Sequence, residues 1–262
     1  MNNPLSKGCT AFLRSLFPDG ILKNKIICLY WNLFRNNDFH ISYSQGFFKI
    51  NKNSHLMIFK GNPYPEFADS LESYFKHYKL NEGDFIVDGG AYTGAFTVYC
   101  AKLIGENGRV ISFEPDAKNY KVLLENIKLN KVEGRVILIK KGLWNLKSRL
   151  AFNKGRSKGA RLDFDGDIRT NSSFINLNSL DNSLSELKLK KIAFIKFDIE
   201  GAEIEALDGS KRTLKENKCP IAIASYHLRG GEKTSKICEE KLRKIGLKTE
   251  TIAGRHTTTY GF

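Results

Sequence analysis

Three acidic residues of this sequence follow apolar runs, at the places where buried strands would end. Asp88 follows the run 85–87 and opens a glycine-rich turn. Glu114 and Asp198 close two later apolar runs in the same way. A carboxylate can accept two hydrogen bonds from a diol such as ribose, and glycine lets a backbone approach a ligand closely. This combination indicates a binding site for a nucleotide cofactor.

The first of these acids lies in a glycine-rich stretch, residues 84–94, with the sequence DFIVDGGAYTG. A dinucleotide-binding loop has glycine at its first, third and sixth positions, and Ala91 at the third position breaks that pattern. The spacing of Asp88, Gly90 and Gly94 fits better the acid-x-Gly-x-x-x-Gly turn of enzymes that bind S-adenosylmethionine (SAM). In that turn the acid lies near the methionine ammonium, and the glycines admit the sulfonium-bearing chain.

The elements that must position these residues are the strands and helices of a doubly wound α/β sheet. Continuous apolar runs are typical of parallel strands that helices cover on both faces. Helical periodicity follows the first two runs, at residues 95–104 and 118–130. Ligands of such sheets bind beyond the carboxyl ends of the strands, where the strand order reverses. We therefore expect Asp198 to lie beside the glycine-rich turn.

A third strand is predicted at residues 136–139, and the loop after it contains Gly142 and Leu143. At this level of the sheet the loop would lie beside the adenine of a bound nucleotide. Residues 144–153 continue as one arm of a hairpin. The segment 153–171 is rich in glycine, serine and charge with little periodicity, which predicts a loop or lid.

The amino-terminal part of the chain carries no cofactor motif. Its apolar segment 21–34 is interrupted by lysine and asparagine, so it is too short and too polar to span a bilayer. Arg14 splits the segment 5–17, which therefore does not read as a signal peptide. A helix packed on the main domain is the favoured interpretation. The alternative is a helix that lies on a membrane surface or covers the substrate.

The domain boundary is predicted near residue 65. Residues 41–60 read as a hairpin, and residues 66–78 carry apolar side chains at helical spacing. We expect the second segment to be the helix that enters the main domain. The chain then has an amino-terminal helical and hairpin extension, residues 1–65, and a cofactor-binding domain, residues 66–262.

The charge and the cysteine content of the sequence limit the cellular compartments and the kinds of partner that we expect. The 262 residues carry a formal charge of +14, but the lysines are scattered and no arginine cluster is interleaved with aromatic residues. A solvated basic surface is therefore favoured over a nucleic-acid interface. The five cysteines are widely spread without a C-x-x-C pair or zinc spacing. This pattern predicts a reducing compartment, and we expect a cytoplasmic protein.

Three blocks of the sequence together resemble the FkbM family of SAM-dependent methyltransferases. They are VDGGAYTG from Val87, FEPDAKNYKVLLENIKLN from Phe113 and IKFDIEGAEIEALDG from Ile195. The likeness covers about residues 82–225. It implies a class I methyltransferase fold, which is a Rossmann-like, doubly wound sheet of seven strands whose last strand is antiparallel, with SAM as the cofactor.

The resemblance also implies roles for the residues at the strand ends. Glu114 would bind the ribose hydroxyls, and Asp198 would lie near the methyl group that is transferred. The glycine-rich turn would shape the pocket for methionine and ribose. The expected cofactor-binding residues are Asp88, Gly90, Tyr92, Thr93, Gly94, Glu114, Pro115, Gly142, Leu143 and Asp198.

Two positions depart from the family pattern. Tyr92 stands where the family often has asparagine, and Ser225 stands where it often has a carboxylate. The second departure weakens any claim that a carboxylate supports His227 or that a metal binds there. Asp198, Glu200 and His227 could supply metal ligands, but three ligands without known geometry are weak grounds. We predict that no metal is required.

The FkbM family is mostly associated with methylation of hydroxyl groups, a reaction that needs a base. His227 is the first candidate because the ordinary pKa of histidine, near 6.5, suits proton acceptance at neutral pH, and Asp198 is the second. A structural role for His227 is the alternative. Glu200 would orient the acceptor or cap the amides of the following helix. Lys196 would pair with an acid or, as favoured, extend along apolar surface.

These observations predict a SAM-dependent methyltransferase that acts on a hydroxyl of a sugar, glycan, lipid or secondary metabolite. One alternative is an N-methyltransferase for nucleic acid or another acceptor, although DIEG stands where adenine-methylating enzymes carry a Pro-Pro-aromatic motif. A second is an NAD-dependent oxidoreductase that uses Glu114. A non-catalytic protein at a membrane surface is a third. Peripheral membrane contact would involve the amino-terminal stretch, and the acceptor and oligomeric state stay open.

Overall fold

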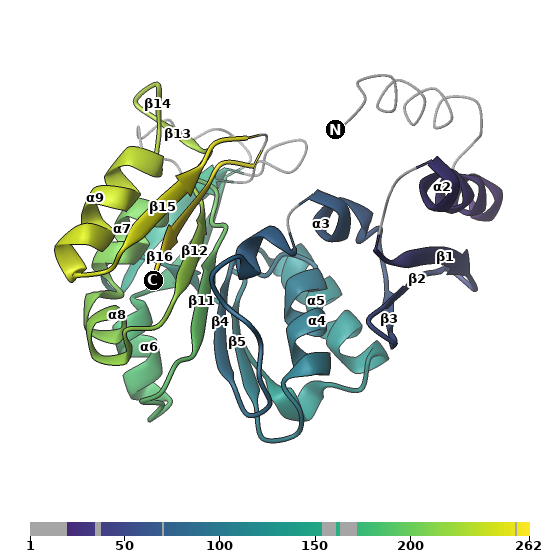
Figure 1. The fold of residues 1–262 in the computed structure, drawn as a ribbon, viewed down its shortest axis with the longest axis horizontal. Coiled ribbons are helices and arrows are strands. Elements are labelled where there is room, and N and C mark those ends of the chain that lie inside the picture. The colour runs from purple at the N-terminus through teal and green to yellow at the C-terminus, as the bar shows by residue number, and fades with distance from the viewer. Residues whose placement is uncertain (1–19, 35–37, 70, 154–160, 163–171, 255) are drawn as a thin grey trace. The chain divides into compact units, whose positions relative to one another are not determined.

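The computed structural model describes residues 20–34, 38–69, 71–153, 161–162, 172–254 and 256–262. The chain divides into two compact units, Met1–Ala68 and Asp69–Phe262 (Figure 1). The segment 5–17, considered above as a signal peptide, lies outside the described residues.

The smaller unit contains a helix and a three-stranded antiparallel sheet of order β1-β2-β3. The segment 41–60, predicted as a hairpin, forms three strands: β2 and β3 pair as the hairpin, and β1 pairs with the other side of β2. Asn32 of the helix α2 holds the backbone of Ile41, donating to its carbonyl oxygen at 2.7 Å and accepting from its N–H at 3.0 Å. The elements are α2 (Ile21–Phe34), β1 (His40–Ser44), β2 (Phe47–Lys52), β3 (His55–Phe59) and α3 (Tyr64–Asp69).

The helix α2 packs on β1 through one face only. Ile27, Cys28 and Trp31 are buried, and the ring of Trp31 stacks on Tyr64 at a centroid distance of 3.8 Å. Leucines on its other side are exposed, including Leu29. No helix among the described residues is long and apolar enough to cross a membrane. Membrane-surface contact by this segment stays a prediction.

The larger unit is built on a seven-stranded sheet of order β15-β16-β12-β11-β4-β5-β6. Five neighbouring strands are parallel to one another: β12, β11, β4, β5 and β6. The last strand of the chain, β16, runs antiparallel to both of its neighbours. This arrangement confirms the predicted fold class. The strands are β4 (Phe85–Gly89), β5 (Arg109–Phe113), β6 (Val136–Ile139), β11 (Phe194–Phe197), β12 (Ile221–Ala224), β15 (Thr249–Ile252) and β16 (Thr258–Gly261).

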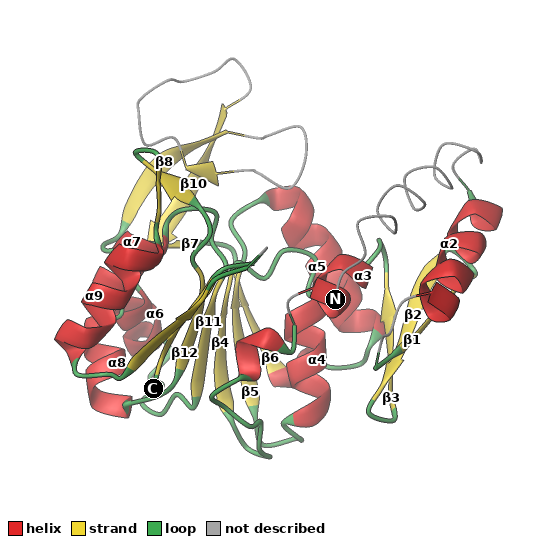
Figure 2. Cartoon of the chain, turned by 45° about the horizontal axis from the view of Figure 1, so that its top comes forward, coloured by secondary structure: helices red, strands yellow, loops and turns green. Residues whose placement is uncertain are grey.

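Helices cover both faces of this sheet. Figures 1 and 2 show α4 and α5 on one face and the remaining α-helices of the unit on the other. The central strands β4, β5 and β11 are almost entirely buried as a result, which explains their continuous apolar sequences. The helices are α4 (Ala95–Leu103), α5 (Ala117–Leu129), α6 (Leu180–Glu186), α7 (Glu203–Asp208), α8 (Lys211–Asn217) and α9 (Ser235–Ile245), with 3₁₀ helices η1 (Ser73–Phe75) and η2 (Glu133–Arg135).

A second sheet, of order β7-β10-β8-β9, follows β6 in the chain (Figure 2). The predicted hairpin arm is β8, which pairs antiparallel with β10. The segment 153–171, predicted as a loop, contains the short strand β9, and most of its other residues lie outside the described part. The strands are β7 (Gly142–Leu143), β8 (Ser148–Asn153), β9 (Arg161–Leu162) and β10 (Ser172–Asn178), and a two-stranded ribbon is formed by β13 (Leu228–Arg229) and β14 (Glu232–Lys233).

The prediction of a single helix at residues 66–78 is wrong. The helix α3 ends at Asp69, and the segment continues as the short 3₁₀ helix η1. Two aromatic side chains of η1 pack on Phe96 of α4, Phe75 stacked at 5.3 Å and Tyr74 edge-on at 5.9 Å. Tertiary packing of these rings has overridden the helical spacing of the sequence.

Candidate functional site

The site lies where the strand order of the large sheet reverses. The chain runs from β4 through β5 to β6 on one side and then returns to β11 on the other side of β4. Gly89 at the end of β4 is paired with Phe113 on one side and Phe197 on the other. Glu114 and Asp198 follow these two partners directly, so the predicted acids meet at one edge of the sheet.

The glycine-rich turn passes close to the end of β11. The N–H groups of Gly90 and Ala91 donate to the carbonyl oxygen of Phe113 at 3.1 and 3.0 Å. Gly90 has a φ of +76°, and a Cβ there would lie 1.9 Å from the carbonyl oxygen of Asp198. Gly94, with a φ of +94°, begins α4, and its Cβ would lie 2.4 Å from Leu123. Only glycine fits these two positions without rearrangement.

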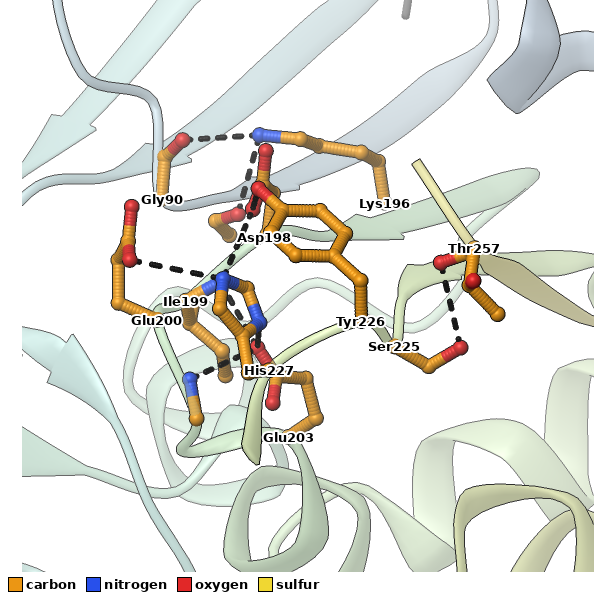
Figure 3. Close-up of polar contacts among 12 residues, drawn as sticks. Gly90, Lys196, Asp198, Ile199, Glu200, Glu203, Ser225, Tyr226, His227 and Thr257 are labelled. Atoms are coloured by element: carbon orange, nitrogen blue, oxygen red, sulfur yellow. Dashed lines mark hydrogen bonds and ion pairs between the residues drawn. The ribbon is translucent and has the colours of Figure 1, made fainter. Parts of the chain in front are cut away.

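Asp88 is fully buried and faces the interior of the sheet. Its Oδ1 lies 2.9 Å from Nζ of Lys196, and its Oδ2 accepts a hydrogen bond from Thr97 at 2.6 Å. The Lys196 ammonium also donates to the carbonyl oxygen of Gly90 at 2.8 Å (Figure 3). The pairing of Lys196 with an acid is thus confirmed, and the favoured expectation of an apolar path to solvent was wrong. Asp88 acts on the turn through Lys196.

Glu114 is buried at the end of β5, beside the turn. One carboxylate oxygen accepts from the N–H of Tyr92 and the other from the N–H of Asp116, both at 2.8 Å. Burial raises the pKa of Glu114 to about 7, against the opposing effect of these hydrogen bonds. Tyr92 has a φ of +50°, a conformation that asparagine tolerates better than tyrosine. The tyrosine that replaces the family's asparagine at position 92 therefore has a strained backbone.

The other predicted cofactor residues lie around these groups. A Cβ on Gly142 would lie 3.6 Å from Pro115, and one on Gly89 would lie 2.8 Å from the buried side chain of Leu143. The loop after β6 therefore meets the ends of β5 and β4. The carbonyl oxygen of Thr93 accepts a hydrogen bond from Asn126 of α5 at 2.7 Å, which anchors the turn from behind.

Two tyrosines hold the carboxylate of Asp198. The hydroxyl of Tyr74 donates to Oδ2 at 3.1 Å, and that of Tyr226 donates to Oδ1 at 3.4 Å. Burial, together with the charge of Asp198, raises the pKa of both phenols, so both are protonated donors at neutral pH. The Asp198 side chain is 28% exposed, which leaves it accessible to a ligand. The sequence did not predict the contact from Tyr74.

His227 lies among three carboxylates (Figure 3). Its Nδ1 is 2.9 Å from Glu203, and its Nε2 is 3.5 Å from Glu200 and 3.9 Å from Asp198. Burial acts to lower the pKa of His227, but the contacts with Glu200 and Glu203 and the charge of Asp198 outweigh it and raise the pKa to about 10. The ring is therefore an imidazolium at neutral pH, which does not accept a proton. A role for His227 as the base stays a prediction.

Glu203, which the sequence did not single out, organises the turn before α7. It is completely buried, and its Oε1 accepts from the N–H groups of Ile199 and Gly201 at 3.3 and 3.1 Å. This carboxylate thus holds two amides of the loop before α7. Glu200 has a left-handed backbone, with a φ of +56°, and faces His227 at the rim.

The position of Ser225 has a structural role. Its hydroxyl is buried between β12 and β16, 2.8 Å from the hydroxyl of Thr259. Among the residues that the structure describes, no group of three histidine, cysteine or acidic side chains has the arrangement of a metal site.

Comparison with known proteins identifies the family. The profile described as Methyltransferase FkbM domain matches residues 88–244, which is more than half of the chain. A crystal structure of methyltransferase FkbM from Methylobacillus flagellatus KT is 19% identical with a TM-score of 0.52, and the match covers 98% of this chain. This chain spans 59% of that protein's length.

Two further structures match at lower similarity. A putative rRNA-methylase from Clostridium thermocellum is 15% identical, with a TM-score of 0.46 over 77% of this chain and 94% of its own. Fibrillarin from Aeropyrum pernix with natively bound SAM is 11% identical, with a TM-score of 0.48 over 86% of this chain and 100% of its own. Both the profile and the fold agree with the motifs of the three blocks, so the chain belongs to the FkbM family of SAM-dependent methyltransferases.

Proposed function

We propose that the protein transfers the methyl group of SAM to a hydroxyl oxygen of a sugar, glycan, lipid or secondary metabolite. The observation that supports this most directly is the edge of the sheet at β5, β4 and β11. Three paired strands end there, and each is followed by a part of the site. The buried Glu114, a candidate for the ribose hydroxyls, follows β5, the glycine-rich turn follows β4, and the partly exposed Asp198 follows β11. Such a row combines the parts that a nucleoside cofactor and a reacting group require.

The residues present fit SAM. Each oxygen of Glu114 already accepts one backbone N–H, and a carboxylate has further lone pairs for the two ribose hydroxyls. Bound SAM would supply a methyl group on a positively charged sulfur. Because Gly90 has no side chain, the turn can approach the backbone of Asp198 closely.

The residue best placed to receive the hydroxyl proton is Asp198. Its carboxylate is oriented by Tyr74 and Tyr226, and Nε2 of His227 lies 3.9 Å away. An acceptor hydroxyl that donates to this carboxylate would present a lone pair to the methyl carbon. Alignment of nucleophile, carbon and sulfur is the main contribution that a protein makes to such a displacement. A polyol could donate a second hydroxyl to Glu200.

The cytoplasm is the compartment that we propose for this reaction. The described cysteines Cys28, Cys100, Cys219 and Cys238 are free and buried. Burial raises the pKa of the Cys28 and Cys219 thiols to about 12, so they act as small apolar side chains. A chain that keeps its thiols in this form suits a reducing environment.

Cofactor binding is tested by thermal shift and isothermal calorimetry with SAM, S-adenosylhomocysteine (SAH) and NAD. SAM and SAH should raise the melting temperature, because a ligand that binds only the folded state stabilises it. NAD should have no effect. Stabilisation by NAD alone would contradict the proposal.

The acceptor class is tested with SAM labelled in its methyl group. Purified protein is incubated with fractions of saccharides, glycolipids, hydroxylated metabolites and nucleic acid. We expect label in a product whose new linkage is a methyl ether, identified by mass spectrometry. Label found only on nucleic-acid nitrogen would replace the proposed hydroxyl acceptor with the alternative of an N-methyltransferase.

A further inference from the structure

We infer that the carboxylates of Asp198 and Glu200 make the site selective for the cationic sulfonium of SAM over the neutral thioether of SAH. This inference rests on the proposed function, because it concerns the same cofactor site. It adds a property that the methyl-transfer reaction does not require, which is the discrimination of cofactor from product by charge.

The charge at the rim has the opposite sign to the charge of the chain. The whole protein carries a formal charge of +14. At the rim, the carboxylates of Asp198, Glu200 and Glu203 surround the single imidazolium of His227. Two further cations near the cluster are paired with other acids, Lys196 with Asp88 and Arg229 with Glu205. Three carboxylates and one imidazolium leave a formal net charge of −2 on this cluster.

A second observation marks this cluster as a ligand position. The side chain of His227 is only 10% exposed, yet neither of its ring nitrogens makes a hydrogen bond of good geometry with a described residue. Its Nε2 points into the space that Asp198 and Glu200 border (Figure 3). Buried polar groups are nearly always hydrogen-bonded, so a donor left open at this depth indicates that an acceptor atom of a bound molecule completes the site.

The cofactor's charged centre should lie at this point of the sheet. The strand order reverses between β4 and β11, and ligands of doubly wound sheets bind in the crevice at that reversal. The turn at Gly90 touches the backbone of Asp198, so a molecule held by the turn extends next to this carboxylate. A positive sulfur near two carboxylates gains an attraction that a neutral sulfur lacks.

The carboxylates are held in place for this task. Tyr74 and Tyr226 fix both oxygens of Asp198. The left-handed backbone of Glu200 turns its side chain toward the rim, where it is 36% exposed. A carboxylate that is already oriented needs no rearrangement when the cation binds, which increases its effect on affinity.

Calorimetry on the full chain tests this with three ligands: SAM, SAH and sinefungin, in which an amine-bearing carbon replaces the methylsulfonium. In Glu200→Gln the ratio of SAM affinity to SAH affinity should fall about three- to tenfold, as expected for one partly exposed carboxylate near the charge. Sinefungin should weaken together with SAM, while SAH should change less than about twofold. The matched control is Glu216→Gln, which removes the same charge from an exposed position at the far end of α8. It should leave the ratio unchanged.

A second measurement does not depend on any variant. For the wild-type protein, raising NaCl from 50 to 500 mM should lower the SAM-to-SAH ratio, because salt screens the attraction between charges. An unchanged ratio in both Glu200→Gln and high salt would overturn the inference while leaving the proposed function intact. If neither SAM nor SAH bound to the wild-type protein, the proposed function itself would be wrong.

Discussion

Lys196 and Asp88 form a buried ion pair across two neighbouring strands, with 2.9 Å between Nζ and Oδ1. The two residues face each other in the register of β11 and β4. The same ammonium donates to the carbonyl oxygens of Gly89 and Gly90 at 3.2 and 2.8 Å. The pair therefore connects the interior of the sheet to the turn that would hold the cofactor.

Removal of one partner of this pair should be strongly destabilising. Lys196→Met leaves Asp88 buried and unpaired, and we expect a loss of about 3–5 kcal/mol in the free energy of unfolding. Urea unfolding followed by circular dichroism measures it. The control is Lys76→Met, which breaks an exposed pair with Glu250 and should cost at most about 1 kcal/mol. Equal effects of the two substitutions would contradict the assigned role of Lys196.

The close approach at Gly90 predicts a difference between two glycines that both have a positive φ. Gly90→Ala places a Cβ against the carbonyl oxygen of Asp198, so it should cost about 3 kcal/mol or more and reduce SAM affinity. Gly83 has a φ of +84°, but a Cβ there would have no neighbour within 4 Å. Gly83→Ala should therefore cost only the backbone strain, about 1–2 kcal/mol, and keep SAM affinity. Equal SAM affinity of the two variants would argue against this position of the turn.

The raised pKa of Glu114 predicts a pH-dependent affinity for the ribose group. The ionised carboxylate is the form that accepts from two hydroxyls, and its pKa is about 7. Affinity should therefore rise about tenfold between pH 6 and pH 8, and binding should release a proton near pH 7. The probe is 5′-methylthioadenosine, which carries the ribose but no titratable amino acid. Glu114→Gln should bind weakly with a flat pH profile, and a flat profile for the wild type would contradict the assignment.

His227 should make the stability of the fold depend on pH. Its pKa is raised from 6.5 to about 10, so the folded protein retains a proton that the unfolded chain loses between these values. The stabilisation is complete below pH 6.5 and is lost as the pH rises through 10, by at most ~1.4 kcal/mol per pH unit for this one proton. His227→Gln should lack this decline in urea unfolding at pH 6.5, 8 and 9.5.

The catalytic prediction for His227 is tested separately. His227→Ala should still bind SAM but slow methyl transfer, because the ring contacts the carboxylates of the rim and not the glycine turn. Transfer is measured with labelled SAM once an acceptor is known. Unchanged turnover would remove His227 from the reaction, and a rate that falls only in Asp198→Asn would assign the base to Asp198.

The positions of Asp88, Glu114 and Asp198 could be predicted because each depends on local sequence. A continuous apolar run indicates a buried parallel strand, and the residue after the run lies at the strand's carboxyl end. Parallel pairing then brings these ends together without further information. The family resemblance added the prediction of seven strands with an antiparallel last strand, which the sheet has.

The contacts that complete the site could not be predicted from local sequence. Tyr74 meets Asp198 across a separation of 124 residues, and its spacing favoured an ordinary helix. Lys196 looked like a residue that extends along apolar surface, since the sequence does not reveal that its neighbour in the sheet is Asp88. The carboxylates that raise the pKa of His227 are also brought to it by tertiary packing. Each of these depends on the packing of distant segments, which residue spacing does not encode.

The left-handed backbone of Glu200 has a consequence for evolution in the laboratory. A side chain at a φ of +56° is less favourable than glycine, so Glu200→Gly should raise the free energy of unfolding by up to about 1 kcal/mol. The same change deletes a carboxylate from the rim. Selection for heat resistance alone would therefore favour a variant that is more stable but binds its cofactor less selectively. The trade-off between stability and activity would then be located at one residue.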